Sequence, residues 1–367
     1  MRILFADLYD AKFSMGGAEK VFLELARSMK EDYGEEVACV VNKGDLADQL
    51  EKLGIPVTEI YWSKWRTLQT ILELKRVLSS FKPDVIHSHH RFTTFLLNLC
   101  FKKDNLILHT EHVPRTDRRR LFRFGHFATA VHESIRENLI QNYRVPADKV
   151  VTIPNAIRLG KPNPEKFREL KKKFGSEAGR ILILCIGRLE EQKGHRYLIE
   201  AVERLAGSYR EKIRILLVGD GKLRGDLEAQ IQKAGLKSVF VFLGHSSDIS
   251  ELLALCDFLV LPSLWEGMPL VILEAYSAGK TVIVTDIPGS RELVRPRETG
   301  ILVPSRDSQA LAEALREIID HPELIPMMGE KAREKWVREC SFDKVTARYH
   351  ELYQNLVSRK NARGRTE

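Results

Sequence analysis

The 367-residue chain has 44% hydrophobic residues and a net charge of +8 at pH 7. This length and apolar content allow two domains with a core each and exclude a disordered chain. Five widely spaced cysteines, with Cys39 and Cys185 inside apolar runs, favour a reducing cytoplasm over a disulfide-stabilised secreted fold. We see no export signal and no run of about 18 apolar residues, so we expect a cytoplasmic protein, at most peripheral at the inner face of the membrane.

Two series of short apolar runs alternate with helix-length segments. In the first half, strands are expected at 3–6, 37–41, 57–60, 85–87, 106–109 and 127–131. In the second half, they are expected at 181–186, 213–218, 239–243, 258–261, 281–284 and 301–303. Such alternation is typical of parallel sheets covered by helices, so the predicted fold class is α/β with two doubly wound domains. Pro and Gly residues after Asn155 place the boundary between domains 1–155 and 156–341.

Two cations lie in the loop 187–194, which follows a strand and precedes a helix. The guanidinium of Arg188 can bind phosphate oxygens in a forked geometry, and Lys193 adds a second positive charge. Together they would stabilise a leaving diphosphate. The alternative is that both cations form structural ion pairs.

A second loop, 262–269, leads into an apolar helix, with Pro269 expected at its first position. Three backbone amides at this helix start would face a phosphate: those of Gly267, Met268 and Leu270. Glu266 precedes the helix and Glu274 lies about a turn and a half inside it, so the two carboxylates cannot contact one atom. Carboxylates accept hydrogen bonds from vicinal hydroxyls, which suits a sugar and a ribose. Capping or salt bridging within the helix is the alternative for Glu274.

Glu266, seven intervening residues and Glu274, with Arg188 and Lys193 upstream, resemble the family-4 retaining glycosyltransferases of the GT-B fold. The resemblance covers nearly the whole chain. It implies two Rossmann-like domains that face each other across a cleft, with a closing helix at 342–358 that packs back on the first domain. It also implies that Arg188 and Lys193 neutralise the donor diphosphate, that Glu266 holds the transferred sugar, and that Glu274 holds the nucleotide ribose.

The same resemblance extends to residues around this constellation. It places Gly16 and Gly17 beside the diphosphate, although alone they would indicate only a tight turn. It places His112, in Thr-Glu-His, near the transferred sugar, which makes this residue a catalytic candidate beside the two cations and Glu266. A structural histidine is the alternative. On the nucleotide side it implies contacts from Gly219, Leu243 and Gly244.

The acceptor is expected to contact the first domain. A basic segment just after His112 suits an anionic or membrane-borne acceptor; its candidate contacts are Arg115, Arg118 and Arg119. A solvated helix face is the alternative for this segment. His132 opens a helix where many relatives have a serine, so it either contacts the acceptor or replaces a cap.

The reaction implied is a hexosyl or N-acetylhexosaminyl transfer from a nucleotide sugar, with UDP more frequent in the family than GDP or ADP. The acceptor would be a glycan, a lipid-linked saccharide or another cell-envelope molecule. Neither a cofactor nor a metal ion is expected: there is no Asp-x-Asp motif, and no further ligand completes a site with His87, His89 and His90. We see no nucleic-acid motif.

Two other kinds of function remain compatible with these features. One is a sugar-nucleotide epimerase or a phosphorylase-like enzyme on the same architecture. The other is a basic protein that binds a membrane or a polyanion and keeps an inactive nucleotide cleft. Acceptor-dependent release of the nucleoside diphosphate would distinguish a transferase from both.

Overall fold

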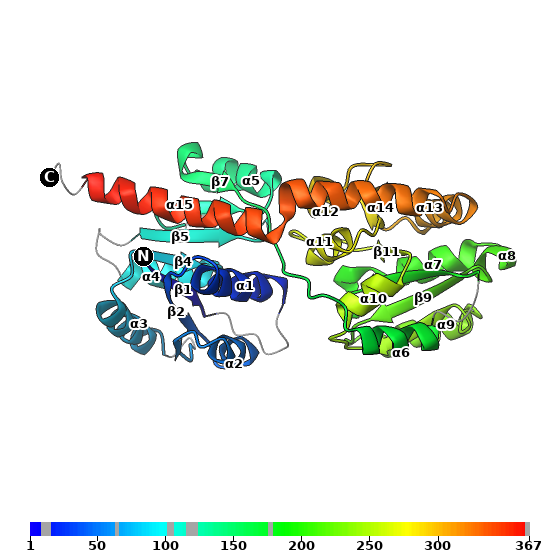
Figure 1. Cartoon of the computed structure of the whole chain (residues 1–367), viewed down its shortest axis with the longest axis horizontal. Helices are drawn as coiled ribbons and strands as arrows, with labels where there is room; N and C mark the ends of the chain where they lie inside the picture. Colours follow the sequence, from blue (N-terminus) through cyan, green and yellow to red (C-terminus); the bar gives the residue numbers. More distant parts are fainter. Residues whose placement is uncertain (9–15, 63–65, 101–105, 115–123, 175–178, 364–367) are drawn as a thin grey trace. The chain divides into compact units, whose positions relative to one another are not determined.

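Figure 1 presents a computed structural model of the chain, which describes residues 1–8, 16–62, 66–100, 106–114, 124–174 and 179–363. The chain divides into two compact units. Unit 1 comprises Met1–Ile157 and Phe342–Glu367, and unit 2 comprises Arg158–Ser341.

Unit 1 contains a parallel sheet of seven strands in the order β3-β2-β1-β4-β5-β6-β7. The strands are β1 (Arg2–Asp7), β2 (Glu36–Val41), β3 (Val57–Glu59), β4 (Val85–Ser88), β5 (Leu106–Glu111), β6 (Phe127–Ala130) and β7 (Val150–Thr152). The first six confirm the predicted strands to within two residues at each end. The short β7 was not predicted, because three residues with one buried side chain give no apolar run.

Two helical layers cover this sheet. Side chains of β1 alternate between them: Ile3 and Phe5 join one core, and Leu4 and Ala6 join the other. The first core is closed by α1 (Gly17–Glu31), α2 (Asp45–Lys52) and α15 (Phe342–Arg363), and the second by α3 (Thr67–Phe81) and α4 (Arg91–Cys100). The last helix, α15, is drawn in red in Figure 1 and buries Tyr349 against the sheet. Helix α5 (Glu133–Tyr143) adjoins β6 and β7.

Unit 2 contains a parallel sheet of six strands in the order β10-β9-β8-β11-β12-β13. The strands are β8 (Ile181–Ile186), β9 (Ile213–Val218), β10 (Phe240–Gly244), β11 (Phe258–Leu261), β12 (Val282–Thr285) and β13 (Gly300–Val303). All six lie where the sequence predicted strands. The fold class is therefore α/β with two doubly wound sheets, as expected.

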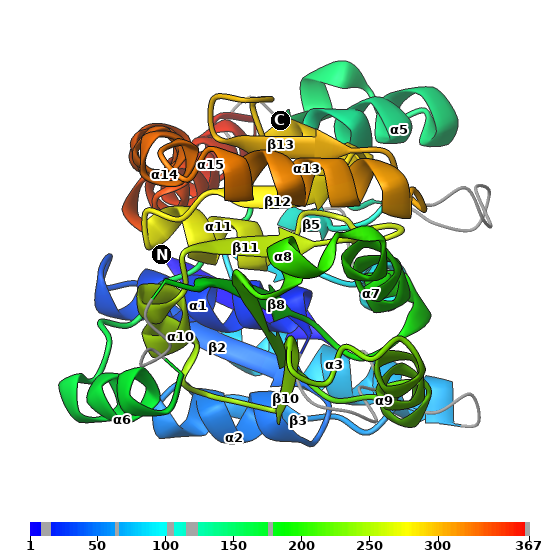
Figure 2. The same cartoon turned by 90° about the vertical axis from the view of Figure 1, so that its right-hand side faces the viewer.

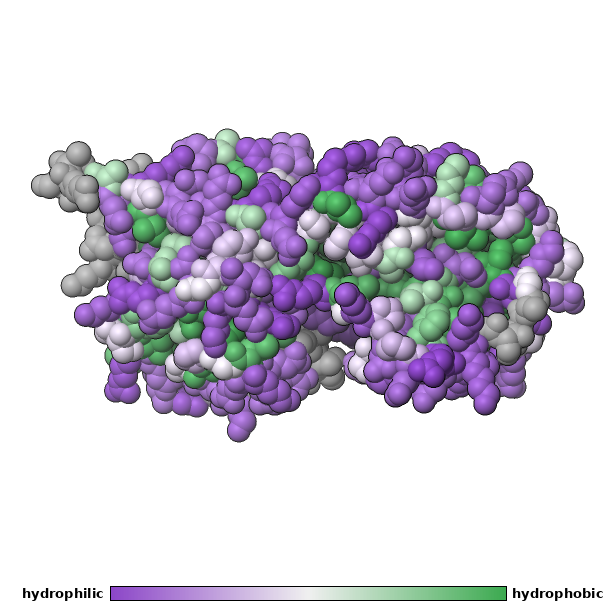
Figure 3. All heavy atoms as spheres, in the orientation of Figure 1, coloured by the Kyte–Doolittle hydropathy of each residue, from purple (hydrophilic) through white to green (hydrophobic). Residues whose placement is uncertain are grey.

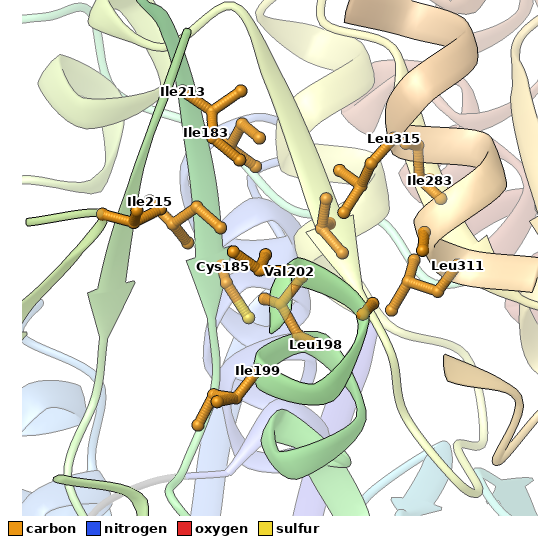
Figure 4. Close-up of a cluster of buried hydrophobic side chains, with 14 of the residues drawn as sticks. Ile183, Cys185, Leu198, Ile199, Val202, Ile213, Ile215, Ile283, Leu311 and Leu315 are labelled. Atoms are coloured by element: carbon orange, nitrogen blue, oxygen red, sulfur yellow. The ribbon is translucent and has the colours of Figure 1, made fainter. Parts of the chain in front are cut away.

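Helices cover both faces of this sheet (Figure 2). On one face lie α7 (His195–Arg204), α9 (Arg224–Lys233) and α13 (Ser308–Asp320), and on the other α10 (Ile249–Leu255) and α11 (Leu270–Ser277). The remaining α-helices are α6 (Pro164–Phe174), α8 (Gly207–Arg210), α12 (Pro288–Leu293) and α14 (Leu324–Lys335). Figure 4 shows Cys185 of β8 packed between the strands and α7, beside Leu198 and Val202. This core fixes the carboxyl end of β8.

Each sheet has a switch point, where strand order reverses. In unit 1, β1 lies between β2 and β4; in unit 2, β8 lies between β9 and β11. Loops that leave neighbouring strands at such a point diverge, and ligands bind in the crevice between them. The switch points therefore locate the candidate sites within each unit.

Candidate active site

Two loops meet at the switch point of unit 2. The loop 187–194 follows β8, and the loop 262–269 follows the neighbouring strand β11. The backbone amide of Leu264 donates to the Gln192 carbonyl at 2.7 Å, and the Gln192 side chain donates to the Trp265 carbonyl at 3.0 Å. The loops that carry the predicted cations and the predicted carboxylate are thus joined directly.

Glu266 and Lys193 form an ion pair across these loops. Lys193 Nζ lies 2.5 Å from Glu266 Oε1, and the two side chains are only 18% and 9% exposed. The same carboxylate accepts hydrogen bonds from Ser263 Oγ at 2.8 Å and from Gln192 Nε2 at 3.4 Å. Ser263 and Gln192 were not singled out from the sequence, although both stand inside the quoted loops. The structure therefore brings Lys193 and Glu266 together in a half-buried ion pair that Ser263 and Gln192 also support.

Arg188, in contrast, is 57% exposed. Its nearest carboxylate is Glu190, with 3.7 Å between Arg188 Nη1 and Glu190 Oε1. An exposed pair at that distance contributes little free energy, so an anionic ligand can replace it. Arg188 thus supplies an exposed cation in the same loop, 187–194, as Lys193.

Glycines let the surrounding backbone approach these loops closely. Gly219, at the end of β9, has φ 133°, and a Cβ there would lie 2.1 Å from the Gly187 carbonyl oxygen. The Gly219 amide donates to the carbonyl of Gly244, which ends β10 together with Leu243. A Cβ on Gly289 of α12 would lie 1.9 Å from the Gly267 carbonyl oxygen. Gly289 is a site-supporting residue that the sequence analysis missed, since a lone glycine there has no local signature.

Helix α11 begins at Leu270, and Pro269 is its N-cap, with ψ 110°. The prediction of Pro269 at the first helical position was wrong by one residue, because its extended ψ puts it outside the helix. Glu274 lies one turn inside α11 and is 7% exposed, while Met268 is buried beside the helix start. Leu270 is the first residue of α11, and Gly267 lies three residues before it.

In unit 1, three histidines cluster at the carboxyl ends of β4 and β5. They are His87, His89 and His112. His112 Nε2 lies 3.0 Å from His89 Nδ1, and the rings of His87 and His89 are 4.4 Å apart. His87 is held by Thr110 Oγ1 and by the Tyr353 hydroxyl of α15, each at 2.7 Å. His112 is therefore held by His89, while Thr110 of β5 and Tyr353 of α15 hold the neighbouring His87.

Burial keeps the rings of this histidine cluster neutral. It lowers the pKa of His112 to about 4, with smaller opposing effects from Glu111 and Asn155, and it lowers the pKa of His89 well below its usual range. His112 keeps some exposed surface, but its Nδ1 is buried. The ring is therefore neutral at pH 7, and a neutral imidazole can donate a hydrogen bond from one nitrogen and accept a hydrogen bond or a proton at the other.

A buried ion pair flanks His112. The Arg91 guanidinium donates to the Glu111 carboxylate and to the Tyr143 hydroxyl, at 2.8 Å for the latter. Burial opposes ionisation of Glu111, but His109 and Arg91 lower its pKa overall. The sequence did not reveal this ion pair, because Arg91 and Glu111 are 20 residues apart, and Glu111 stood out only as the middle residue of Thr-Glu-His.

The other predicted site residues of unit 1 lie at helix starts or outside the described residues. Gly16 is the N-cap of α1, and Gly17 is its first residue. His132 stands at the N-cap of α5 without a capping hydrogen bond; it is 2% exposed, and its Nδ1 lies 2.9 Å from Ser134 Oγ. Arg115, Arg118 and Arg119 lie outside the described residues.

The described residues contain neither a metal-binding cluster nor a membrane-spanning helix. Among them, no group of three His, Cys, Asp or Glu side chains is placed to hold a metal ion. None of their helices combines the length and apolar character needed to cross a membrane. Purple, hydrophilic residues cover most of the face drawn in Figure 3.

Known sequences and structures resemble both halves of the chain. Residues 166–335 match the family described as Glycosyl transferases group 1, and residues 15–161 match Glycosyltransferase Family 4. An Escherichia coli relative, UDP-Gal:alpha-D-GlcNAc-diphosphoundecaprenol alpha-1,3-galactosyltransferase, is 28% identical over 86% of each chain. A Campylobacter jejuni relative, N-acetylgalactosamine-N,N'-diacetylbacillosaminyl-diphospho-undecaprenol 4-alpha-N-acetylgalactosaminyltransferase, is 27% identical over 72% of this chain and 64% of its own.

The fold is shared with Anabaena HepE, whose crystal structure contains UDP. The two superpose with a TM-score of 0.85 and 22% identity, over 97% of this chain and 100% of HepE.

Proposed function

We propose that this chain, which belongs to the family-4 glycosyltransferases of the GT-B fold, moves a sugar from a UDP-sugar to a saccharide or lipid-linked acceptor with retention of anomeric configuration. Unit 2 would bind the donor and unit 1 the acceptor. The observation that carries the proposal is the half-buried Lys193–Glu266 ion pair at the switch point of unit 2, in the loop that also carries the exposed Arg188.

The chemistry requires stabilisation of negative charge. As the bond between the anomeric carbon and the diphosphate oxygen breaks, its electron pair passes to the diphosphate. Arg188 would bind this group directly. A lysine ammonium has three N–H donors, so Lys193 can keep its contact with Glu266 and still donate to a phosphate oxygen. Fixed cations would thus do the work of a divalent metal ion.

The sugar and ribose would be held by carboxylates. Glu266, held by Lys193 and Ser263, would accept hydrogen bonds from the transferred sugar, and Glu274 would accept them from the ribose. The acceptor hydroxyl would attack the same face of the sugar that the diphosphate leaves, and its proton would pass to the departing diphosphate.

The comparisons support the donor and the acceptor class. The HepE structure contains UDP, and the Escherichia coli relative is named for UDP-galactose and a diphosphoundecaprenol acceptor. A lipid-linked acceptor would require contact with an anionic membrane surface. Flotation of the full chain with vesicles of anionic phospholipid at low salt tests that contact, and no flotation would contradict it.

The decisive experiment is a donor screen. UDP-, GDP- and ADP-sugars are incubated with the full chain, a polyprenyl-diphosphate-linked saccharide and excess EDTA, and nucleotide release is followed by mass spectrometry. We expect UDP release that depends on the acceptor, and an α-linked product by NMR from an α-linked donor. Conversion of the donor to its epimer without acceptor, or no turnover with any donor, would contradict the proposal.

A further inference from the structure

We propose that His89 is a positioning residue that fixes the ring orientation and tautomer of His112. Only the expected effect of His89 on turnover rests on the proposed function. The hydrogen bond between the two imidazoles, 3.0 Å from His89 Nδ1 to His112 Nε2, carries the proposal. From the sequence alone, His89 was a candidate only for a metal site.

Packing holds His89 in one place. The residue is 5% exposed, and its ring lies 5.3 Å from that of Phe22 and 4.4 Å from that of His87. His87 is in turn held by Thr110 and by Tyr353 of α15. His89 therefore presents its Nδ1 to His112 from a rigid position.

The buried surroundings decide which nitrogen of His89 carries the proton. Its Nε2 is buried and has no hydrogen-bond partner among the described residues. A buried N–H without an acceptor costs more than a buried lone pair, so the proton of the neutral ring belongs on Nδ1. His89 Nδ1–H then donates to His112 Nε2.

The tautomer of His112 follows from that of His89. Because its Nε2 accepts a hydrogen bond, the neutral His112 ring must carry its proton on Nδ1. His112 Nδ1 is likewise buried and makes no hydrogen bond among the described residues. The two outer nitrogens differ in that the side chain of Asn155 interacts with His112 in the sense that raises its pKa, whereas no group among the described residues raises the pKa of His89. An acceptor for the His112 N–H therefore lies nearby, and His89 has none on its outer side in the described part of the chain. Protonation of His112 at Nε2 would set two N–H groups against each other, so the hydrogen bond from His89 also keeps His112 neutral.

Two variants separate this role from simple packing. His89→Phe keeps an aromatic ring but removes the donor, whereas His89→Asn is smaller but can place an amide N–H near the former Nδ1. We expect His89→Phe to lower kcat by on the order of 100-fold with little change in the donor KM, because His112 loses its fixed orientation. We expect His89→Asn to retain most of kcat. A role in packing alone gives the opposite order and would overturn the proposal.

Nitrogen-15 NMR of histidine-labelled protein gives a readout that does not depend on turnover. In the wild type, we expect the proton on His112 Nδ1 and on His89 Nδ1, and in His89→Phe a mixture of His112 tautomers. A wild-type His112 with its proton on Nε2 would overturn the proposal. Since this spectrum needs no donor, a wild type that fails to transfer sugar would contradict the proposed function and leave the His89 result intact.

Discussion

At the scale of single residues, the two predicted cations have different environments. Lys193 is committed to Glu266 in a half-buried pair, so its charge is already balanced before a ligand binds. Arg188 has only the distant, exposed Glu190. Without a ligand, Lys193 therefore forms a structural ion pair, as the alternative interpretation proposed, whereas Arg188 forms only a weak one. We therefore expect Arg188 to be the cation whose loss affects turnover without affecting stability.

Arg188→Ala tests this difference. We expect kcat to fall by about 100- to 1000-fold, as for the loss of one donor to a developing anion, while the free energy of unfolding changes by less than about 0.5 kcal/mol. Arg196→Ala is the matched control, since Arg196 is also exposed and also has a carboxylate at 3.7 Å, that of Glu200. Steady-state kinetics and urea unfolding measure both. Equal kinetics for the two variants would remove Arg188 from the site.

At the scale of elements, the site loop 262–269 is shaped by a helix that contributes no predicted site residue. The start of α12 approaches the Gly267 carbonyl so closely that only a glycine fits at position 289. The position of Glu266 therefore depends on the packing of α12 as well as on its own loop.

Gly289→Ala should displace the loop. The added Cβ would meet backbone atoms, which cannot rotate away, so we expect a loss of stability of about 1–3 kcal/mol together with weaker donor binding. Gly225→Ala in α9 is the control: nothing lies within 4 Å of its added Cβ, and we expect a neutral or slightly stabilising effect. Thermal unfolding and UDP titration measure both effects. A Gly289→Ala variant that binds UDP like the wild type would contradict this account.

At the scale of the whole molecule, both units contain buried neutral histidines. In unit 2, burial lowers the pKa of His195 to about 4 from 6.5, with a further contribution from the Lys193 charge. In unit 1, His87 and His89 are likewise shifted well downward by burial. These groups bind protons only after unfolding when the pH lies between their folded and unfolded pKa values. The folded protein should therefore lose stability as the pH falls below 6.5.

His195→Gln measures one such contribution. Above pH 6.5 neither state is protonated, so the site has no effect on pH dependence. Between pH 6.5 and 4, only the unfolded wild type gains a proton there, which costs the folded state up to about 3 kcal/mol. We expect the variant to lose that much less stability than the wild type across this range in urea unfolding. Parallel stability curves for the two proteins would contradict the shifted pKa.

The sequence by itself determined those features that depend on residues close to one another along the chain. Apolar runs identified twelve strands, and the loops that carry Arg188 and Glu266 were predicted at strand ends, because periodicity and turn residues are local signals. The chemistry of those loops, cations for a diphosphate and carboxylates for hydroxyls, was equally local. The three-residue β7 was not predicted, and Pro269 was placed one residue too far into its helix, because short strands and helix ends have weak sequence signals.

Only the tertiary structure decided which distant residues meet. Strand order sets β8 beside β11, so Lys193 reaches Glu266 across 73 residues of sequence. The same packing pairs His89 with His112 and brings Tyr353 of α15 to His87. Parallel strands need long crossovers, so no local pattern reveals which strands become neighbours. The residue types of the site were therefore readable from the sequence, whereas their partners depended on the packing of the sheets.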